Sequence, residues 1–345
     1  MKIDTCIKPP AVNQSGLDTS FSIQGTGFYV PEHVVTNEML TRDLDTSDEW
    51  IREKIGVRER RYLPDDLATS DMCVSASLDA IRDAGISCEE IDAIVLATTT
   101  PDHRVPSTAL IVKEKLGAKN AIPFDLTQGA CAGGIFAILL ASHLLQNQMI
   151  KNVLVIGAEV LSRSTDPADR ATRVYFGDAA GAILLQKTGE DCGLLSWHLD
   201  SSLNMAVTIH GAGTAPLPEG ADLASSHYIR MNGREVWKVA TQKMPDSIRN
   251  VVQKAGLQVS DIDHFVMHQA NLNIIKEAMR SLDVPLEKTT VTIQEYANTG
   301  AASLFSALHH SLTEKAVKQG DYLVISAIGA GFLWGSLCLK YNKNE

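Results

Sequence analysis

A repeat within the chain is the feature that most constrains its fold. Residues 84–96 (AGISCEEIDAIVL) match residues 255–267 (AGLQVSDIDHFVM), with Ala, Gly, Ile, Asp and Val at the same places. A nearly equal shift pairs the VLVIG that begins at 153 with the YLVIS that begins at 322. Matches in the same order predict two halves with the same fold. We therefore expect an N-terminal half over 1–190 and a C-terminal half over 191–345.

Within each half, apolar runs of strand length alternate with helical segments, which predicts a layered α/β protein. The 345 residues are 45% hydrophobic and 21% charged, as in ordinary globular proteins. No apolar run is long enough to cross a bilayer, so we expect no membrane association. A formal charge of −10 argues against nucleic-acid partners.

The six cysteines are scattered, without a CxxC pair or a histidine-rich cluster. This pattern predicts free thiols in a reducing cytoplasm and no metal site. Residues 1–16 have no apolar core of the kind found in secretory signals, and we expect them to form a loose polar lead-in.

Cys131 lies where a predicted strand, 121–126, passes through a glycine-containing loop into a helix that is apolar on nearly every face. Such a helix is buried. Its first turn has unpaired N–H groups that favour negative charge, so we expect the thiol pKa to be lowered and Cys131 to be a nucleophile. The alternative is a packed core cysteine. The repeat favours the nucleophile, because the shift that relates 84–96 to 255–267 places Ala302 opposite Cys131.

The second half has gained polar residues near the ends of its predicted elements. His268 stands at the end of a strand where the first half has Ala97, and Asn298 comes shortly before the helix that matches the cysteine helix. Strand ends and helix starts are where α/β folds bind ligands. If the halves pack around a pseudo-twofold axis, Cys131, His268 and Asn298 converge on one cleft.

These segments carry a resemblance to a known family. In chain order they are Asp48-Glu49-Trp50-Ile51, Phe124 to Gly133 around Ala130-Cys131-Ala132, Phe176-Gly177-Asp178, His268-Gln269-Ala270-Asn271, Asn298 to Ser303 and Gly329 to Gly335. Together they resemble the 3-oxoacyl-[acyl carrier protein] synthase III family of the thiolase-like superfamily. The resemblance implies an α/β fold of five layers, αβαβα, built from two duplicated halves about a pseudo-twofold axis and usually found as a homodimer. The family's Cys-His-Asn triad corresponds to Cys131, His268 and Asn298.

The resemblance also implies a reaction. Cys131 would be acylated by an acyl-CoA or acyl-carrier-protein donor, with the oxyanion held by the backbone N–H groups of Cys131 and Gly331. A malonyl thioester would then lose CO₂, and its enolate, stabilised by His268 and Asn298, would attack the acyl group. No metal or redox cofactor is implied. The alternative is an acyltransferase of this fold that passes the acyl group to an oxygen or nitrogen acceptor.

The same comparison implies substrate-binding positions and exposes some departures. Trp50, Lys54, Arg58 and Asn271 would contact coenzyme A or its pantetheine arm, although Lys54 stands where the family commonly has Arg. Val105 replaces a bulky aromatic that often closes the acyl tunnel across the dimer, which indicates a longer or branched acyl chain. Asn273 replaces the usual carrier-docking Arg, so either another basic surface, with Lys276 and Arg280 as candidates, docks the carrier or the donor differs.

Overall fold

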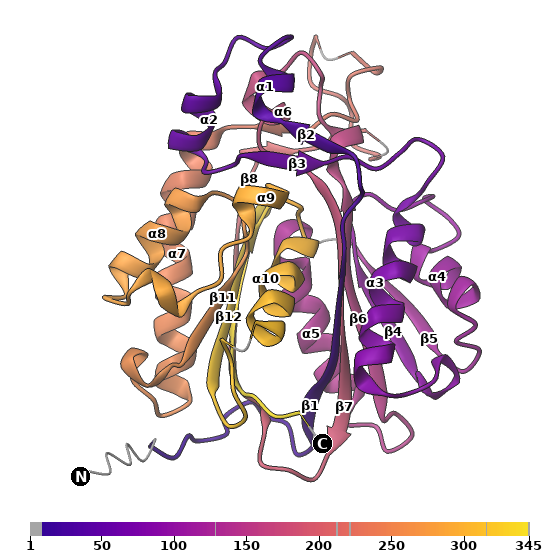
Figure 1. Ribbon diagram of the computed structural model, residues 1–345, viewed down its shortest axis with the longest axis vertical. Coiled ribbons are helices and arrows are strands. Elements are labelled where there is room, and N and C mark those ends of the chain that lie inside the picture. Colours follow the sequence, from indigo (N-terminus) through magenta and orange to yellow (C-terminus); the bar gives the residue numbers. More distant parts are fainter. Residues whose placement is uncertain (1–8, 128, 212, 221, 315, 344–345) are drawn as a thin grey trace.

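The computed structural model describes residues 9–343 except 128, 212, 221 and 315; Cys6 and the first part of the lead-in lie outside this range. The chain forms five layers (Figure 1): an outer pair of helices, a sheet, a central pair of helices, a second sheet and another outer pair. This is the α/β layering that the repeat and the resemblance predict.

The first sheet has the strand order β1-β7-β6-β4-β5. β4 runs parallel to both β5 and β6, whereas β7 is antiparallel to β6 and β1. β4 and β6 are buried along their whole length, as expected for nearly continuous apolar strands covered on both faces. The strands are β1 (Ser20–Tyr29), β4 (Ala93–Ala97), β5 (Ile122–Leu126), β6 (Asn152–Val160) and β7 (Asp178–Thr188).

The second sheet repeats this order as β8-β13-β12-β11, with the same strand directions. A parallel bridge between Phe265 and Thr289 takes the place of the β4–β5 pairing. The two halves therefore share one topology. The strands are β8 (Gly193–Asn204), β11 (His264–Met267), β12 (Tyr322–Gly329) and β13 (Gly331–Lys340).

The ladders correct one of the sequence matches. Ile94 pairs with Leu154, and its counterpart Phe265 pairs with Val324, so Leu154 corresponds to Val324. The match of 153–157 with 322–326 is therefore wrong by one residue. Such a slip reverses which face of the sheet each side chain occupies. Similar apolar residues on both faces of a buried strand hide the slip in the sequence.

Helices α5 (Gly133–Leu144) and α10 (Ala302–Thr313) lie between the sheets, where they share one apolar core with the inner faces of both. The side chain of Phe305 on α10 packs into the space left by glycines of three other elements. A Cβ added to Gly134, Gly157 or Gly181 would lie 3.0, 2.6 or 2.4 Å from its atoms. Close packing of this kind fixes the position of α10 relative to the first half.

The outer helices bury their apolar sides on the outer faces of the sheets. On the first sheet they are α3 (Thr69–Ala84) and α4 (Thr108–Leu116); on the second they are α7 (Gly233–Lys254) and α8 (Leu272–Ser281). No described helix is both long and apolar enough to cross a bilayer.

Smaller elements gather above one end of the sheets (Figure 1). They are α1 (Asn37–Leu40), α2 (Asp48–Lys54), α6 (Arg170–Arg173), α9 (Ile293–Tyr296), β2 (Val34–Thr36), β3 (Glu59–Arg61), β9 (Val207–Thr208) and β10 (Arg230–Met231).

The expectation of a loose lead-in is wrong from residue 11 onward. Val12 N–H donates to Ala255 O at 2.8 Å, and Gln14 N–H donates to Leu195 O at 2.7 Å, so this segment is bound to the second half.

Candidate active site

Cys131 lies in a 3₁₀ turn, Ala130–Ala132, that leads directly into α5. The preceding residue, Ala130, has φ +42°, a left-handed conformation that is uncommon for a residue with a side chain. This sharp entry joins β5 to the buried helix in a few residues. It places the sulfur at the helix N-terminus, where unpaired N–H groups lie.

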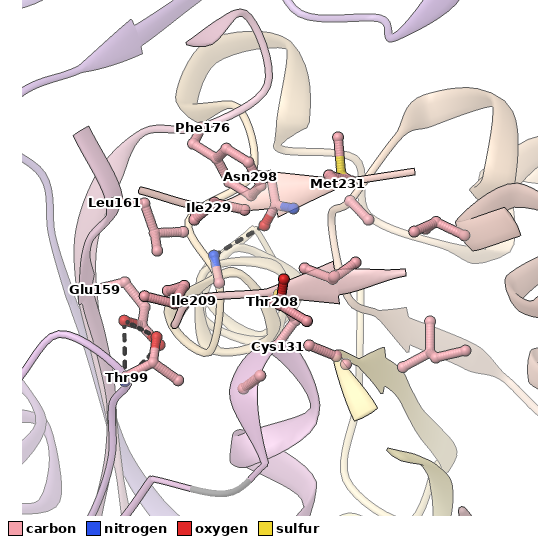
Figure 2. Close-up of a pocket in the computed structure, with 18 of the residues that line it drawn as sticks. Thr99, Cys131, Glu159, Leu161, Phe176, Thr208, Ile209, Ile229, Met231 and Asn298 are labelled. Carbon is pink, nitrogen blue, oxygen red and sulfur yellow. Dashed lines mark hydrogen bonds between the residues drawn. The ribbon is translucent and has the colours of Figure 1, made fainter. Parts of the chain in front are cut away.

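Cys131, His268 and Asn298 all line one cavity of about 660 Å³. Cys131 comes from the first half, and the other two come from the second. The rest of the wall is largely apolar and includes Val207. It also includes Leu161, Phe176, Ile209, Ile229 and Met231 (Figure 2). The cavity therefore combines a thiol, an imidazole and an amide with space for an apolar chain.

His268 follows β11 and is 3% exposed. Its Nδ1 lies 2.5 Å from Ser303 Oγ, and that oxygen also accepts a hydrogen bond from Gln269 N–H at 3.1 Å. We assign the Ser303 hydroxyl as the donor to His268 Nδ1, which leaves the ring proton on Nε2. Burial lowers the pKa of His268 to about 3, so the ring is neutral near pH 7.

Asn298 is oriented by its own loop and by the first half. Its Oδ1 accepts the Gly300 N–H at 2.9 Å (Figure 2), so Nδ2 is the group left to donate elsewhere. On the backbone, Asn298 N–H donates to Tyr175 O at 2.9 Å and Gly177 N–H donates to Asn298 O at 3.0 Å. A loop of the second half is thus fixed to a loop of the first.

The expectation that the Cys131 pKa is lowered is wrong for the unliganded protein. Burial raises the pKa of the thiol to about 12, and the carboxylate of Glu159 adds to the rise. The backbone N–H of Cys131 and the side chain of Asn298 act in the opposite direction, but more weakly. The helix N-terminus is present as predicted, yet loss of water around the sulfur outweighs it.

The backbone near Cys131 is shaped by Gly329, at the end of β12. A Cβ added there would lie 2.5 Å from Gly129 O and 3.0 Å from Cys131 N. The missing side chain therefore lets the end of β12 pack closely against the turn that holds Cys131. Gly331 itself does not line the cavity, although its neighbours Ala330 and Phe332 do.

Comparisons with known proteins address the family directly. Sequence models described as 3-oxoacyl-[acyl-carrier-protein] synthase III and as its C-terminal region match residues 124–202 and 252–341. A curated relative, beta-ketoacyl-[acyl-carrier-protein] synthase III 1 of Halalkalibacterium halodurans, is 42% identical over 325 residues, which are 94% of this chain and 100% of the relative. The chain belongs to the 3-oxoacyl-[acyl-carrier-protein] synthase III family.

Solved structures agree with this assignment. The synthase III of Aquifex aeolicus is 40% identical, with a TM-score of 0.86 over 94% of this chain and 100% of that chain. The priming β-ketosynthase of the R1128 polyketide pathway is 28% identical, with a TM-score of 0.86 over 99% and 100%. The thiolase-like fold expected from the sequence is confirmed.

Four residues are expected to bind substrate from the family resemblance: Trp50, Lys54, Arg58 and Asn271. They do not line the cavity. Trp50, on α2, faces Arg170 of α6, whose guanidinium carbon is 5.3 Å from the ring centroid. The exposed Lys54 forms an ion pair with Glu53 at 2.6 Å. Arg58 lies in the loop between α2 and β3, and its N–H donates to Gln294 O at 2.8 Å.

Asn271 caps α8 and donates from Nδ2 to Lys54 O at 3.0 Å. Asn273, which stands where the synthase III family commonly has Arg, also donates from Nδ2 to Lys54 O, at 3.1 Å. Both amides therefore tie α8 to the end of α2. Val105 is 84% exposed and its neighbour Arg104 lines the cavity.

Sequence reasoning missed three residues of the site. Glu159 lines the cavity at the end of β6, and the available signal was a carboxylate in an otherwise apolar strand. Ser303 gave no signal beyond its place beside Ala302. Arg170 gave none, because only the folded chain brings it to Trp50. Among described residues, no group of three or more His, Cys, Asp or Glu side chains is arranged to hold a metal ion.

Proposed function

We propose that this chain is a decarboxylative condensing enzyme that transfers an acyl group from a thioester to Cys131 and joins it to a malonyl thioester. The observation that carries the proposal is the meeting of Cys131, His268 and Asn298 on one cavity in a synthase III family member. The product is a 3-oxoacyl thioester.

In the first half-reaction the Cys131 sulfur attacks the thioester carbonyl, the carbon–sulfur bond to the donor breaks, and the thiol proton ends on the departing thiol. The oxyanion lies at the N–H of Cys131, with Gly331 as the proposed second donor. Each such donor is typically worth about 3 kcal/mol of barrier. A thiol whose pKa is raised loses its proton as it attacks rather than beforehand.

In the second half-reaction the bond between the malonyl methylene and its carboxylate breaks. CO₂ leaves, and the electron pair forms an enolate that attacks the acyl carbon. The Cys131 thiolate is released and takes a proton from solvent. His268 Nε2–H and Asn298 Nδ2–H donate to the enolate oxygen, and both are neutral, so they stabilise the oxyanion without protonating the nucleophilic carbon.

The proposed substrates are acyl thioesters of coenzyme A or acyl carrier protein, with no resident cofactor. The stacked pair of Trp50 and Arg170 supports binding of an adenine, because aromatic and guanidinium planes stack on bases. Lys54, Arg58 and Asn271 remain candidates for the phosphate and pantetheine contacts. Lys276 is exposed, whereas Arg280 is paired with Glu277 at 2.6 Å, so we favour Lys276 for docking an acidic carrier.

We also propose a homodimer. β5 is an edge strand of the first sheet, and its Ile122 is 50% exposed. An uncovered apolar edge strand invites pairing with another chain. Val105, 84% exposed, would then reach the partner's acyl tunnel. The division into halves 1–190 and 191–345, with the nucleophile in the first and His268 and Asn298 in the second, belongs to the same proposal, as does a cytoplasmic setting.

Acyl loading followed by a malonyl chase tests the function. Intact mass spectrometry of the protein after incubation with a panel of acyl thioesters would report acylation of Cys131, with Cys131→Ala as the control. Malonyl-acyl carrier protein should then remove the label with release of CO₂. Fatty-acid initiation and polyketide priming would differ in the acyl group that loads best. A loaded enzyme that ignores malonyl donors but discharges to an alcohol or amine would establish the acyltransferase alternative.

A further inference from the structure

The N-termini of α5 and α10 both lie near the cavity, and a different kind of residue lies in front of each. A strand of the second half crosses the start of α5, and a strand of the first half crosses the start of α10. Because Leu154 corresponds to Val324, the residue of β6 that corresponds to Gly329 is Glu159. Equivalent positions therefore hold no side chain in front of Cys131 and a carboxylate in front of α10.

Several hydrogen-bond donors surround the Glu159 carboxylate. It accepts the Thr99 N–H at 3.1 Å, the Thr99 hydroxyl at 2.9 Å and the Thr100 hydroxyl at 2.8 Å (Figure 2 shows Thr99). It also accepts the backbone N–H of Ala301, at the start of α10. A Cβ on Gly300 would lie 2.6 Å from Glu159 Cγ. The side chain thus takes a helix N-terminal N–H, as an anion does.

The donors around Glu159 favour its charged form. Thr100 Oγ1 accepts the Val160 N–H at 2.8 Å, so its own hydrogen is free to point at the carboxylate. A carboxylate accepts several such bonds, whereas a protonated carboxyl would need an acceptor as well. Burial opposes the charge and raises the pKa of Glu159 to about 7 despite these bonds. The group is therefore charged above neutral pH.

We propose that Glu159 is a built-in anion at the start of α10, the helix that corresponds to the cysteine helix, and that it positions Asn298 for the decarboxylation step. The inference rests on the proposed function. Glu159 packs on Gly300 and accepts from Ala301, while Gly300 N–H orients the Asn298 amide. The Glu159 side chain therefore acts on Asn298 through this loop and is a positioning residue.

Glu159→Gln tests this inference, because it keeps the shape and removes the charge. Release of CO₂ from malonyl-acyl carrier protein should fall about 10- to 100-fold, the cost of a misplaced catalytic group. Acylation of Cys131, measured at pH 6 where the charge of Glu159 is largely absent in wild type as well, should stay within about threefold, because the Cys131 N–H is untouched.

The rate at which iodoacetamide alkylates Cys131 gives a second measurement, which would not change if Glu159 had only a structural role. At pH 8 the variant should react about tenfold faster than wild type, because a negative charge near the sulfur is gone, and the two should converge at pH 6. Around Cys131, the neutral His268 and the exposed Arg104 also line the cavity. Behind Glu159, on α3, the buried Cys73 lies near Asp102 and Asp125 as well as Glu159.

Asp178→Asn is the matched control. Asp178 is a buried carboxylate that accepts the Leu63 N–H at 2.8 Å and the Ser162 hydroxyl at 2.6 Å, but it does not line the cavity. Its replacement should leave the alkylation ratio between pH 8 and pH 6 unchanged. If Glu159→Gln does not fold, Glu159→Asp serves instead: it keeps the charge and slow alkylation, but its shorter side chain should still reduce CO₂ release.

The outcomes separate the two proposals. If wild-type Cys131 takes up no acyl label, the proposed function fails and this inference fails with it. If wild type loads and condenses but Glu159→Gln releases CO₂ equally fast, or loses both half-reactions to the same extent, only the inference is refuted. An alkylation ratio that does not differ from wild type also refutes it, because the charge would then have no effect at the sulfur.

Discussion

Asn298→Asp separates the two half-reactions with little change in shape. The introduced carboxyl can keep the bond from Gly300 N–H, at 2.9 Å in the native protein, but it offers an acceptor in place of Nδ2. Losing one preorganised donor typically costs 10²–10³ in rate, about 2.7–4 kcal/mol. If the carboxyl is charged, its repulsion of the enolate at about 4 Å adds about 4 kcal/mol at an effective dielectric constant of 20.

We therefore expect CO₂ release to fall by about 10⁵ to 10⁶ where the introduced carboxyl is charged, and by less than about 10² at low pH, where it is protonated and can donate again. Cys131 acylation should remain measurable, because its oxyanion is held by backbone N–H groups.

Single-turnover experiments provide the measurement. Loading of Cys131 is measured by mass spectrometry. Release of CO₂ from labelled malonyl-acyl carrier protein is measured between about pH 5.5 and about pH 8, a range that spans both protonation states of the introduced carboxyl. Asn120→Asp, at an exposed asparagine whose Nδ2 donates to Glu89 O, adds the same charge away from the cavity and should behave as wild type. Equal loss of acylation and decarboxylation in Asn298→Asp would refute the division of labour.

Four further predictions follow from the same geometry. Ser303→Ala removes the group that holds the proton of His268 on Nε2; CO₂ release should fall by about 10-fold or more, and ¹⁵N NMR of the ring should report a changed tautomer, so an unchanged spectrum would contradict the assignment. Gly329→Ala places a Cβ 3.0 Å from Cys131 N and should abolish acylation, measured by mass, while thermal unfolding reports any loss of fold. Lys276→Glu should raise KM for the carrier-bound substrate several-fold and leave KM for acyl-CoA unchanged, whereas equal changes would exclude a docking role. Since the pKa of the Cys131 thiol is raised to about 12, alkylation of the free protein should keep accelerating through pH 10 without a plateau, and a plateau near pH 8 would show that the thiol is not so perturbed.

The sequence predicted the duplication and the three residues that meet in the cavity because both depend on local patterns. A repeat preserves the order of elements, and differences between its copies mark Cys131 and His268 as additions. The thiol pKa was not predictable in this way. It depends on removal of water and on Glu159, which reaches the site only through pairing of β6 with its neighbours. Desolvation is a property of the packed fold.

The register of the second repeat match failed for a different reason. A shift of one residue along a buried apolar strand changes the face of each side chain but barely changes the letters compared. Only the ladder partners Ile94–Leu154 and Phe265–Val324 resolve it. That single residue decides whether Glu159 corresponds to Ile328 or to Gly329.

The lead-in that crosses to the second half has a consequence for how the chain unfolds. Residues before β1 hydrogen-bond with Leu195 and Ala255, while Asn298 of the second half is bound to Tyr175 and Gly177 of the first. Thus the segment before β1 is bound to the second half, and the loop around Asn298 is bound to the first. Opening of either half breaks hydrogen bonds with the other, so we expect the two duplicated halves to unfold together.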